Sequence, residues 1–92
     1  MYKIRFSNQY KKSIRKLAKT AHFPLCELEK VIDNLKNGIQ IAEKYRDHKL
    51  SGELKKYREC HIRPDLLLVY QIRDEELVLF LLDIGSHSHL FN

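Results

Sequence analysis

Histidine and carboxylate side chains recur in the second half of the chain, where they interrupt otherwise ordinary predicted elements. The set consists of His48, His61, Asp65, His87 and His89. Histidine gives and takes protons near neutral pH. Two histidines on opposite sides of a phosphodiester can therefore cleave RNA, because one removes the proton of a ribose 2′-hydroxyl and the other protonates the departing 5′-oxygen. A nearby Arg or Lys would stabilise the added negative charge at phosphorus.

Each of these residues also has an ordinary structural interpretation. On position alone Asp65, in "RPDLL", is a turn residue, and His61 on a strand face would bond a neighbour such as Glu59. His87 and His89 stand at i and i+2, a spacing that clamps a metal only on an extended segment with further ligands. The further candidate ligands do not form a recognised zinc spacing; they are His48, Asp65, Asp83 and Cys60. The metal interpretation is therefore the weaker one.

Hydrophobic periodicity predicts the elements that must position these side chains. Residues 1–6 alternate as a half-buried strand does. A helix is predicted over roughly residues 9–20, with Ser7 or Asn8 as its cap. A second helix is predicted from Pro24, in its first turn, to about Asn37. These two helices should form a hairpin joined by a short turn.

The second half of the chain reads as a loop followed by strands. Gly38 is placed to end the second helix, and residues 39–56 lack a sustained period, so we expect a structured loop with a helical turn. Three strands joined by tight turns are predicted to follow, over residues 57–63, 66–73 and 76–84. The last strand is apolar on both faces and should be central or covered on both sides. The order predicts one α+β domain over residues 1–92, an antiparallel meander packed on a helical pair.

The basic charge is unevenly distributed along the chain. The formal net charge is +5, and residues 1–20 hold seven Lys or Arg and no acid. Residues 44–63 are also net basic, whereas residues 21–43 and 64–92 are net acidic. Two basic segments separated by an acidic one favour a polyanionic partner such as nucleic acid. The plain alternative is a domain whose helix faces happen to be rich in lysine.

Several classes of protein are disfavoured by composition. There is no apolar span long enough for a bilayer and no signal-peptide pattern, so we expect a cytoplasmic protein with no membrane partner. Cys26 and Cys60 lie far apart, and we expect both to be reduced thiols packed as small hydrophobes. No phosphate loop, nucleophile elbow or carboxylate metal pair is present, and we expect no cofactor.

Three short motifs follow one another in the second half of the chain. They are "DH-L-G" at Asp47–Gly52, "YR-CHI-PD-LLVY" at Tyr57–Tyr70 and "GSHS-LF" at Gly85–Phe91. In this order they resemble the YafQ-type toxins of the RelE superfamily, which are bacterial toxin–antitoxin ribonucleases. The basic first helix and the apolar second helix match in character, so the resemblance spans nearly the whole chain.

The resemblance implies a RelE-like, microbial-RNase-like α+β fold with the active site on the concave face of a twisted antiparallel sheet. It further implies mRNA cleavage in the ribosomal A site without a metal, and neutralisation by an acidic antitoxin. The implied partners are therefore that antitoxin, mRNA and ribosomal RNA on the 70S ribosome. The basic first helix would contact ribosomal RNA.

The resemblance also implies roles for individual residues. His48 and His61 match histidines implicated in acid–base chemistry, and Asp65 matches an active-site carboxylate that orients a histidine. His87 matches the histidine usually favoured as general acid. Phe91 matches an aromatic residue that shapes the site or holds an mRNA base.

The sequence departs from the family pattern in two places near the expected site. Leu66 stands where some relatives have a tryptophan, and Asp83 stands where relatives usually place an arginine near the scissile phosphate. A carboxylate there would repel the phosphate unless it were protonated or salt-bridged. The cations available to compensate or to bind substrate are Arg46, Lys49, Arg63 and Arg73. His89 also differs from relatives, which often carry an acid or a small residue there.

Three functions compete on this basis. The leading hypothesis is a ribosome-dependent endoribonuclease toxin with His48, His61, Asp65 and His87 as catalytic residues. The alternative is a non-catalytic or weakened relative that binds RNA or antitoxin, because Asp83 replaces the expected arginine. A third is a metal-dependent enzyme that uses the histidine pair His87 and His89.

Overall fold

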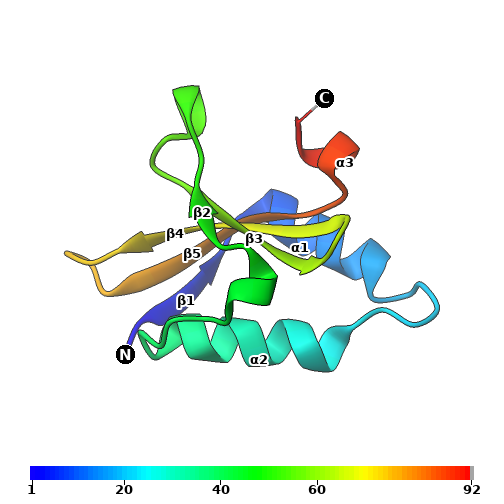
Figure 1. Ribbon diagram of the computed structural model, residues 1–92, viewed down its shortest axis with the longest axis horizontal. Coiled ribbons are helices and arrows are strands. Elements are labelled where there is room, and N and C mark those ends of the chain that lie inside the picture. Colours follow the sequence, from blue (N-terminus) through cyan, green and yellow to red (C-terminus); the bar gives the residue numbers. More distant parts are fainter. Residues whose placement is uncertain (92) are drawn as a thin grey trace.

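The computed structural model describes residues 1–91 and has the α+β architecture expected from the sequence. A five-stranded sheet has its longest helix on one side and a short C-terminal helix on the other (Figure 1). The elements in chain order are β1 (Lys3–Phe6), α1 (Asn8–Leu17), α2 (Leu25–Lys36), η1 (Glu43–Tyr45), β2 (His48–Lys49), η2 (Gly52–Leu54), β3 (Arg58–Arg63), β4 (Leu66–Arg73), β5 (Val78–Gly85) and α3 (His87–Phe91).

The strands are ordered β1-β5-β4-β3-β2 across the sheet. The predicted antiparallel meander of β3, β4 and β5 is confirmed. The first strand was assigned no partner from the sequence, and it pairs in parallel with β5. β5 therefore lies between β1 and β4, which explains why it is apolar on both faces.

Helices α1 and α2 pack on one face of the sheet and form the core with it. Ser7 caps α1, since its side chain accepts a hydrogen bond from the backbone N–H of Tyr10. The buried residues of α2 meet the inward-facing residues of the strands; they include Leu28, Val31, Leu35, Cys60, Leu68, Tyr70, Leu79, Leu81 and Ile84. Gly38 follows α2 with φ +71, as the predicted helix end requires.

Several local expectations were wrong. Pro24 is the residue before α2 and not part of its first turn. The segment over residues 39–56 has the expected helical turns, η1 and η2, but it also contains the strand β2, which was missed because two residues are too few to show a period. Cys60 is buried as expected, but Cys26 is exposed.

The last described residues form the short helix α3, which was not predicted. In Figure 1, α3 rises from the sheet on the side opposite α2, and so does the segment that carries β2 and η2. These two segments flank the face of the sheet that the core does not cover. Among residues 1–91, no helix combines the length and the apolar character needed to cross a bilayer.

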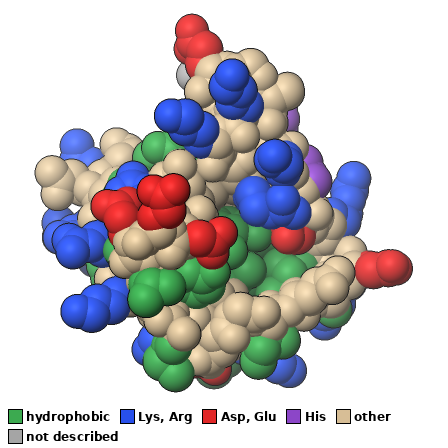
Figure 2. Space-filling view, turned by 90° about the vertical axis from the view of Figure 1, so that its left-hand side faces the viewer, with side chains coloured by type: hydrophobic (Ala, Val, Ile, Leu, Met, Phe, Trp, Pro, Cys, Tyr) green, Lys and Arg blue, Asp and Glu red, His purple; other side chains and the backbone are tan. Residues whose placement is uncertain are grey.

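The end of the molecule that carries the β4–β5 turn has a different character. Acidic side chains gather there beside a hydrophobic area, and histidines reach only the margin of this view (Figure 2). The turn contributes Asp74, Glu75 and Glu76. The histidine-based chemistry expected from the sequence therefore belongs to another face.

Candidate functional site

A buried carboxylate, Glu59 on β3, lies between two of the histidines singled out from the sequence. Its Oε1 is 3.2 Å from Nε2 of His48 and 3.5 Å from Nε2 of His61. Glu59 is only 6% exposed, and its Oε2 has no hydrogen-bond partner among residues 1–91. The structure thus brings His48 and His61 together around a carboxylate that the sequence had suggested only as a neighbour of His61.

Backbone carbonyls determine which ring nitrogens of these histidines carry protons. Nδ1 of His48 is 2.7 Å from the carbonyl oxygen of Arg46, and Nδ1 of His61 is 3.2 Å from that of Pro64. A carbonyl oxygen only accepts, so both Nδ1 atoms donate. Both Nε2 atoms then face one oxygen of Glu59, and each contact is a hydrogen bond only when a proton lies between the two atoms. The three side chains therefore form a site that can take up or release a proton.

A second polar network attaches β2 to the sheet and so positions His48. Asp47 accepts hydrogen bonds from Nε and Nη2 of Arg58 at 3.3 and 3.0 Å, and the hydroxyl of Tyr70 donates to the same carboxylate. Burial raises the pKa of Tyr70, and the bond to Asp47 raises it further, so this phenol remains a donor. In the β2–β3 register His48 pairs with Glu59, which directs both side chains to the same face.

His87 and Phe91, from α3, lie on the other side of a cavity that Glu59 also lines. The cavity has a volume of about 280 Å³, and its lining residues are Leu50, Ser51, Leu54, Glu59, His87 and Phe91. The rings of His87 and Phe91 pack together with centroids 5.0 Å apart. Four of the residues singled out from the sequence therefore gather around one cavity, two through their contact with Glu59 and two as its wall.

Asp65 has a different contact from the one expected. Its Oδ1 accepts a hydrogen bond of 3.0 Å from the backbone N–H of His87, and no bond to a histidine ring is found for it among residues 1–91. The backbone N–H of His89 donates to Oγ of Ser86 at 3.1 Å. Both bonds satisfy N–H groups at the start of α3, so Asp65 holds the beginning of the helix that carries His87.

The cations predicted to bind substrate do not gather at this cavity. Arg63 forms an ion pair with Glu27 on α2, because a register shift between His61 and Arg63 interrupts the alternation of β3. Lys49 pairs with Arg58 in the β2–β3 register, so alternation directs it away from the face of His48. Arg46 is exposed, and its backbone carbonyl is what contacts the site.

The carboxylate of Asp83 is hydrogen-bonded by residues other than the cations expected to compensate it. Its Oδ1 accepts from the hydroxyl of Ser13 at 2.6 Å and from the backbone N–H of Ile84 at 2.8 Å. Its Oδ2 is 3.2 Å from Nε2 of His89. Arg73 is held elsewhere, over the ring of Phe80 and beside Gln71. Asp83 therefore contacts α1 and α3 and does not line the cavity of Glu59.

The structure does not provide the extended segment on which His87 and His89 could together bind a metal ion. His87 and His89 lie on a helix, where residues two apart point in different directions, and not on the extended segment that a metal clip needs. Among the described residues, no group of three or more His, Cys, Asp or Glu side chains is arranged to hold a metal ion.

Nearly the whole chain is similar in sequence to one family of known proteins. The sequence model of the family described as bacterial toxin of type II toxin–antitoxin system, YafQ, matches residues 2–92. The chain belongs to this family. The mRNA interferase toxin YafQ of Escherichia coli K12 is 35% identical over 89 residues, which cover 96% of this chain and 94% of that protein.

Solved structures of toxins share the whole fold. The crystal structure of a metal-bound toxin from Helicobacter pylori is 49% identical, with a TM-score of 0.92, and the match covers 99% of this chain and 100% of that one. The E. coli DinJ–YafQ complex contains a chain that is 31% identical, with a TM-score of 0.85 and complete coverage of both chains. The RelE-like α+β fold expected from the sequence is thereby confirmed.

The sequence-based reasoning missed the site roles of two residues. Glu59 was considered only as a neighbour of His61, and its polar side chain on the same face of β3 as His61 was the available signal. Ser13 lies among the apolar positions of α1 and is buried, but nothing in the sequence indicated which residue it would contact.

Proposed function

We propose that this chain is an endoribonuclease toxin that cleaves mRNA in the ribosomal A site without a metal ion. Its partners are mRNA and ribosomal RNA on the 70S ribosome in the cytoplasm, and an acidic antitoxin neutralises it. One observation carries the catalytic part of the proposal. His48 and His61 converge on the buried Glu59, and this carboxylate lines a cavity whose far wall holds His87 and Phe91.

The proposed reaction needs one group that accepts a proton and one that donates a proton, on opposite sides of the phosphodiester. The cluster of His48, Glu59 and His61 accepts the proton of the ribose 2′-hydroxyl, and the 2′-oxygen forms a bond to phosphorus. The bond from phosphorus to the 5′-oxygen breaks, and His87 gives its proton to that oxygen. The products are a 2′,3′-cyclic phosphate and a 5′-hydroxyl, so atoms and protons balance.

Substrate binding at the cavity relies on aromatic and imidazole groups. No Lys or Arg is found among the described residues that line it. Protonated imidazoles therefore supply the positive charge that stabilises the pentavalent phosphate. The exposed part of the Phe91 ring, next to His87, offers a surface on which an mRNA base stacks.

The partners are inferred from charge and from relatives. The E. coli relative is called an mRNA interferase, and the DinJ–YafQ complex pairs a toxin of this fold with a second protein. Helix α1 carries Lys11, Lys12, Arg15 and Lys16 and no acidic residue. Such a helix suits contacts with ribosomal RNA phosphates, and these contacts weaken as salt rises.

The contacts of Asp83 bear on the non-catalytic alternative. That alternative was motivated by a carboxylate that would repel the scissile phosphate. Ser13, Ile84 and His89 all donate toward Asp83, and its side chain is only 14% exposed. This arrangement supports the catalytic proposal, because the carboxylate is satisfied away from the cavity.

Inducing the chain in bacteria without its partner tests the proposal. We expect growth arrest and new mRNA 5′ ends inside translated codons, and we expect His87→Ala to abolish both. His22→Ala, at an exposed histidine in the α1–α2 loop, is the matched control and should arrest growth as the wild type does. Equal arrest by the wild type and His87→Ala would refute the acid role of His87, and 5′ ends outside translated regions would refute ribosome dependence.

A further inference from the structure

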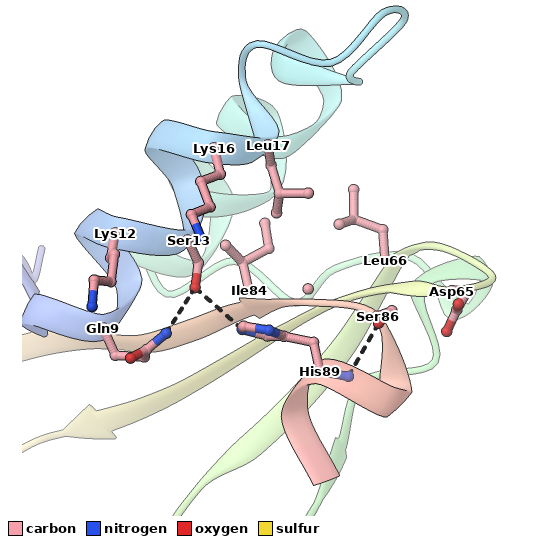
Figure 3. Close-up of a pocket in the computed structure, with 11 residues that line it drawn as sticks. Gln9, Lys12, Ser13, Lys16, Leu17, Asp65, Leu66, Ile84, Ser86 and His89 are labelled. Atoms are coloured by element: carbon pink, nitrogen blue, oxygen red, sulfur yellow. Dashed lines mark hydrogen bonds between the residues drawn. The ribbon is translucent and has the colours of Figure 1, made fainter. Parts of the chain in front are cut away.

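A network of four side chains links α1, β5 and α3 on the side of α3 away from the Glu59 cavity. Ser13 of α1 donates its only hydroxyl proton to Asp83 of β5. Gln9 donates to the oxygen of Ser13 at 3.2 Å. His89 of α3 lies with Nε2 3.2 Å from both Ser13 Oγ and Asp83 Oδ2. Figure 3 shows the ring of His89 directed from α3 toward Ser13 on α1.

The proton on His89 follows from its neighbours. The hydroxyl proton of Ser13 is already donated to Asp83, so Ser13 can only accept from His89. The carboxylate oxygen of Asp83 also only accepts. Nε2 of His89 must therefore carry a proton, which it shares between the two oxygens. The network is complete only with a donor at position 89 and an acceptor at position 83.

Gly85 leaves the space that the ring of His89 occupies. A Cβ atom at Gly85 would lie 2.5 Å from Cδ2 and 2.9 Å from Cγ of His89. The backbone at Gly85 does not have a positive φ, in contrast to Gly38 and Gly52. Alanine would therefore fit the backbone at position 85. Its severe conflicts would be with the imidazole, and a milder close contact of 3.3 Å would remain with Cβ of His89.

Helix α3 needs such support because it is short. It spans five residues, His87–Phe91, and an isolated helix of this length is not stable in water. Asp65 and Ser86 satisfy N–H groups at its start. His89 supplies the side-chain contact that ties the body of the helix to α1 and β5.

We infer that Ser13, Asp83 and His89 form a joint that positions α3, and with it His87 and Phe91, over the cavity of Glu59. Asp83 and His89 are thus positioning residues for the proposed cleavage, on which this inference rests. A cavity of about 320 Å³ lies beside the joint, lined by residues of α1 and the end of β5 as well as by Ser13 and His89 themselves.

The first test is independent of catalysis. In the purified chain, we expect His89→Ala and Asp83→Asn to speed hydrogen exchange of the Leu90 amide about tenfold, since this N–H bonds the carbonyl of Ser86 in α3. The NMR signals of the His87 ring should shift in both variants. Controls are His22→Ala and Asp33→Asn, exposed positions that should leave both readouts unchanged. Unchanged exchange and unchanged His87 signals in the joint variants would overturn the inference.

The second test is a double-mutant cycle on the cleavage rate. We expect Gly85→Ala and His89→Ala each to slow cleavage about tenfold, because misplacing a catalytic group by about 1 Å can cost about a hundredfold and a smaller displacement correspondingly less. Gly85→Ala should have little further effect in the His89→Ala background, where the ring is gone. Effects that multiply would show that Gly85 acts independently of His89, against the inference.

The third test exchanges the donor and the acceptor of the joint. Asp83→Arg alone should slow cleavage, because it places a cation opposite the donor of His89. Adding His89→Glu should restore most of the rate, because it places an acceptor at position 89 opposite the new donor at position 83. Faster cleavage by Asp83→Arg alone would mean that the native carboxylate opposes the chemistry, and the joint would be refuted.

Failure of the proposed function can be distinguished from failure of the joint. If the wild type does not cleave RNA, the proposed function fails, but hydrogen exchange at Leu90 and the NMR signals of His87 still test the joint.

Discussion

The carboxylate of Glu59 lies 3.2 Å from the imidazole of His48, in register across the β2–β3 pair. His61 contacts the same oxygen from two residues along β3. A buried carboxylate with a second oxygen that has no partner among the described residues is costly for folding. Such a group is expected where proton transfer, rather than stability, has selected the residue.

Glu59→Gln is expected to separate activity from stability. The amide fills the same space and can donate to either imidazole, but it cannot accept the proton. We expect cleavage to fall about a hundredfold, while the free energy of unfolding stays equal or rises by about 1 kcal/mol. Initial cleavage rates and urea unfolding of the same preparations measure the two effects. Glu53→Gln, at an exposed position, is the control, and a Glu59→Gln variant as active as the wild type would remove Glu59 from the mechanism.

Substitutions of Asp65 can distinguish a role in capping α3 from a role in acid–base chemistry. Asn retains an oxygen that accepts the N–H of His87, whereas Ala does not. We expect Asp65→Ala to destabilise the start of α3 by about 1 kcal/mol and to slow cleavage, and Asp65→Asn to keep most of the rate. Hydrogen exchange at the His87 amide, measured with the cleavage rate, tests this. An Asn variant as impaired as the Ala variant would mean that the charge or a proton of Asp65 matters.

The free energy of unfolding should decrease in alkaline solution because a buried thiol and a buried phenol have raised pKa values in the folded chain. Burial raises the pKa of Cys60 from 9.0 to about 12, and the charges of Asp47 and Glu59 add to the effect. Burial likewise raises the pKa of Tyr10 from 10.0 to about 12. Between these limits the unfolded chain loses protons that the folded chain keeps, so the free energy of unfolding falls as pH rises.

For Cys60 the expected slope is about 1.4 kcal/mol per pH unit above its unfolded pKa of 9.0. Urea unfolding across this range measures the slope in the wild type and in Cys60→Ala. In Cys60→Ala the free energy of unfolding should be lower overall, but above pH 9.0, the unfolded pKa of the thiol, it should fall less steeply with pH than in the wild type. Parallel curves for the two proteins would contradict this prediction.

Chelation and a substrate analogue test the proposed chemistry at the RNA. Ribosomes need magnesium, so the assay contains magnesium in excess over EDTA. Under these conditions, we expect EDTA to leave the cleavage rate unchanged. Replacing the 2′-hydroxyl at the cleavage position by hydrogen should abolish cleavage, because the attacking oxygen is lost. Loss of activity that returns with added zinc or copper would favour a metal-dependent reaction, and cleavage of the 2′-deoxy substrate would exclude attack by the 2′-oxygen.

Local sequence patterns were sufficient for the regular elements. Strand β4 was predicted at its observed bounds, Leu66–Arg73, and the apolar character of β5 correctly indicated a central position. Ser7 and Gly38 act within one turn of their helices, so their roles depend on neighbours in the chain. The ordered motifs were likewise sufficient for the family.

Short elements were not predictable from the same patterns. Strand β2 has two residues and α3 has five, and neither length allows a period to be recognised. The parallel pairing of β1 with β5 also has no local signal. These elements form because the rest of the fold supplies their partners.

The sequence by itself determined the order of helices and strands, the core-forming faces, the family and the set of histidines available for chemistry. Only the tertiary structure decided which partner each polar side chain meets: Glu59 for His48, the backbone of His87 for Asp65, Glu27 for Arg63, and Ser13 with His89 for Asp83. The physical reason is that these partners are brought together by strand register, by helix docking and by two register shifts, one in the β3–β4 pair after His61 and one in the β4–β5 pair between Val69 and Tyr70. These features depend on packing across the whole sheet and not on the residues next in sequence.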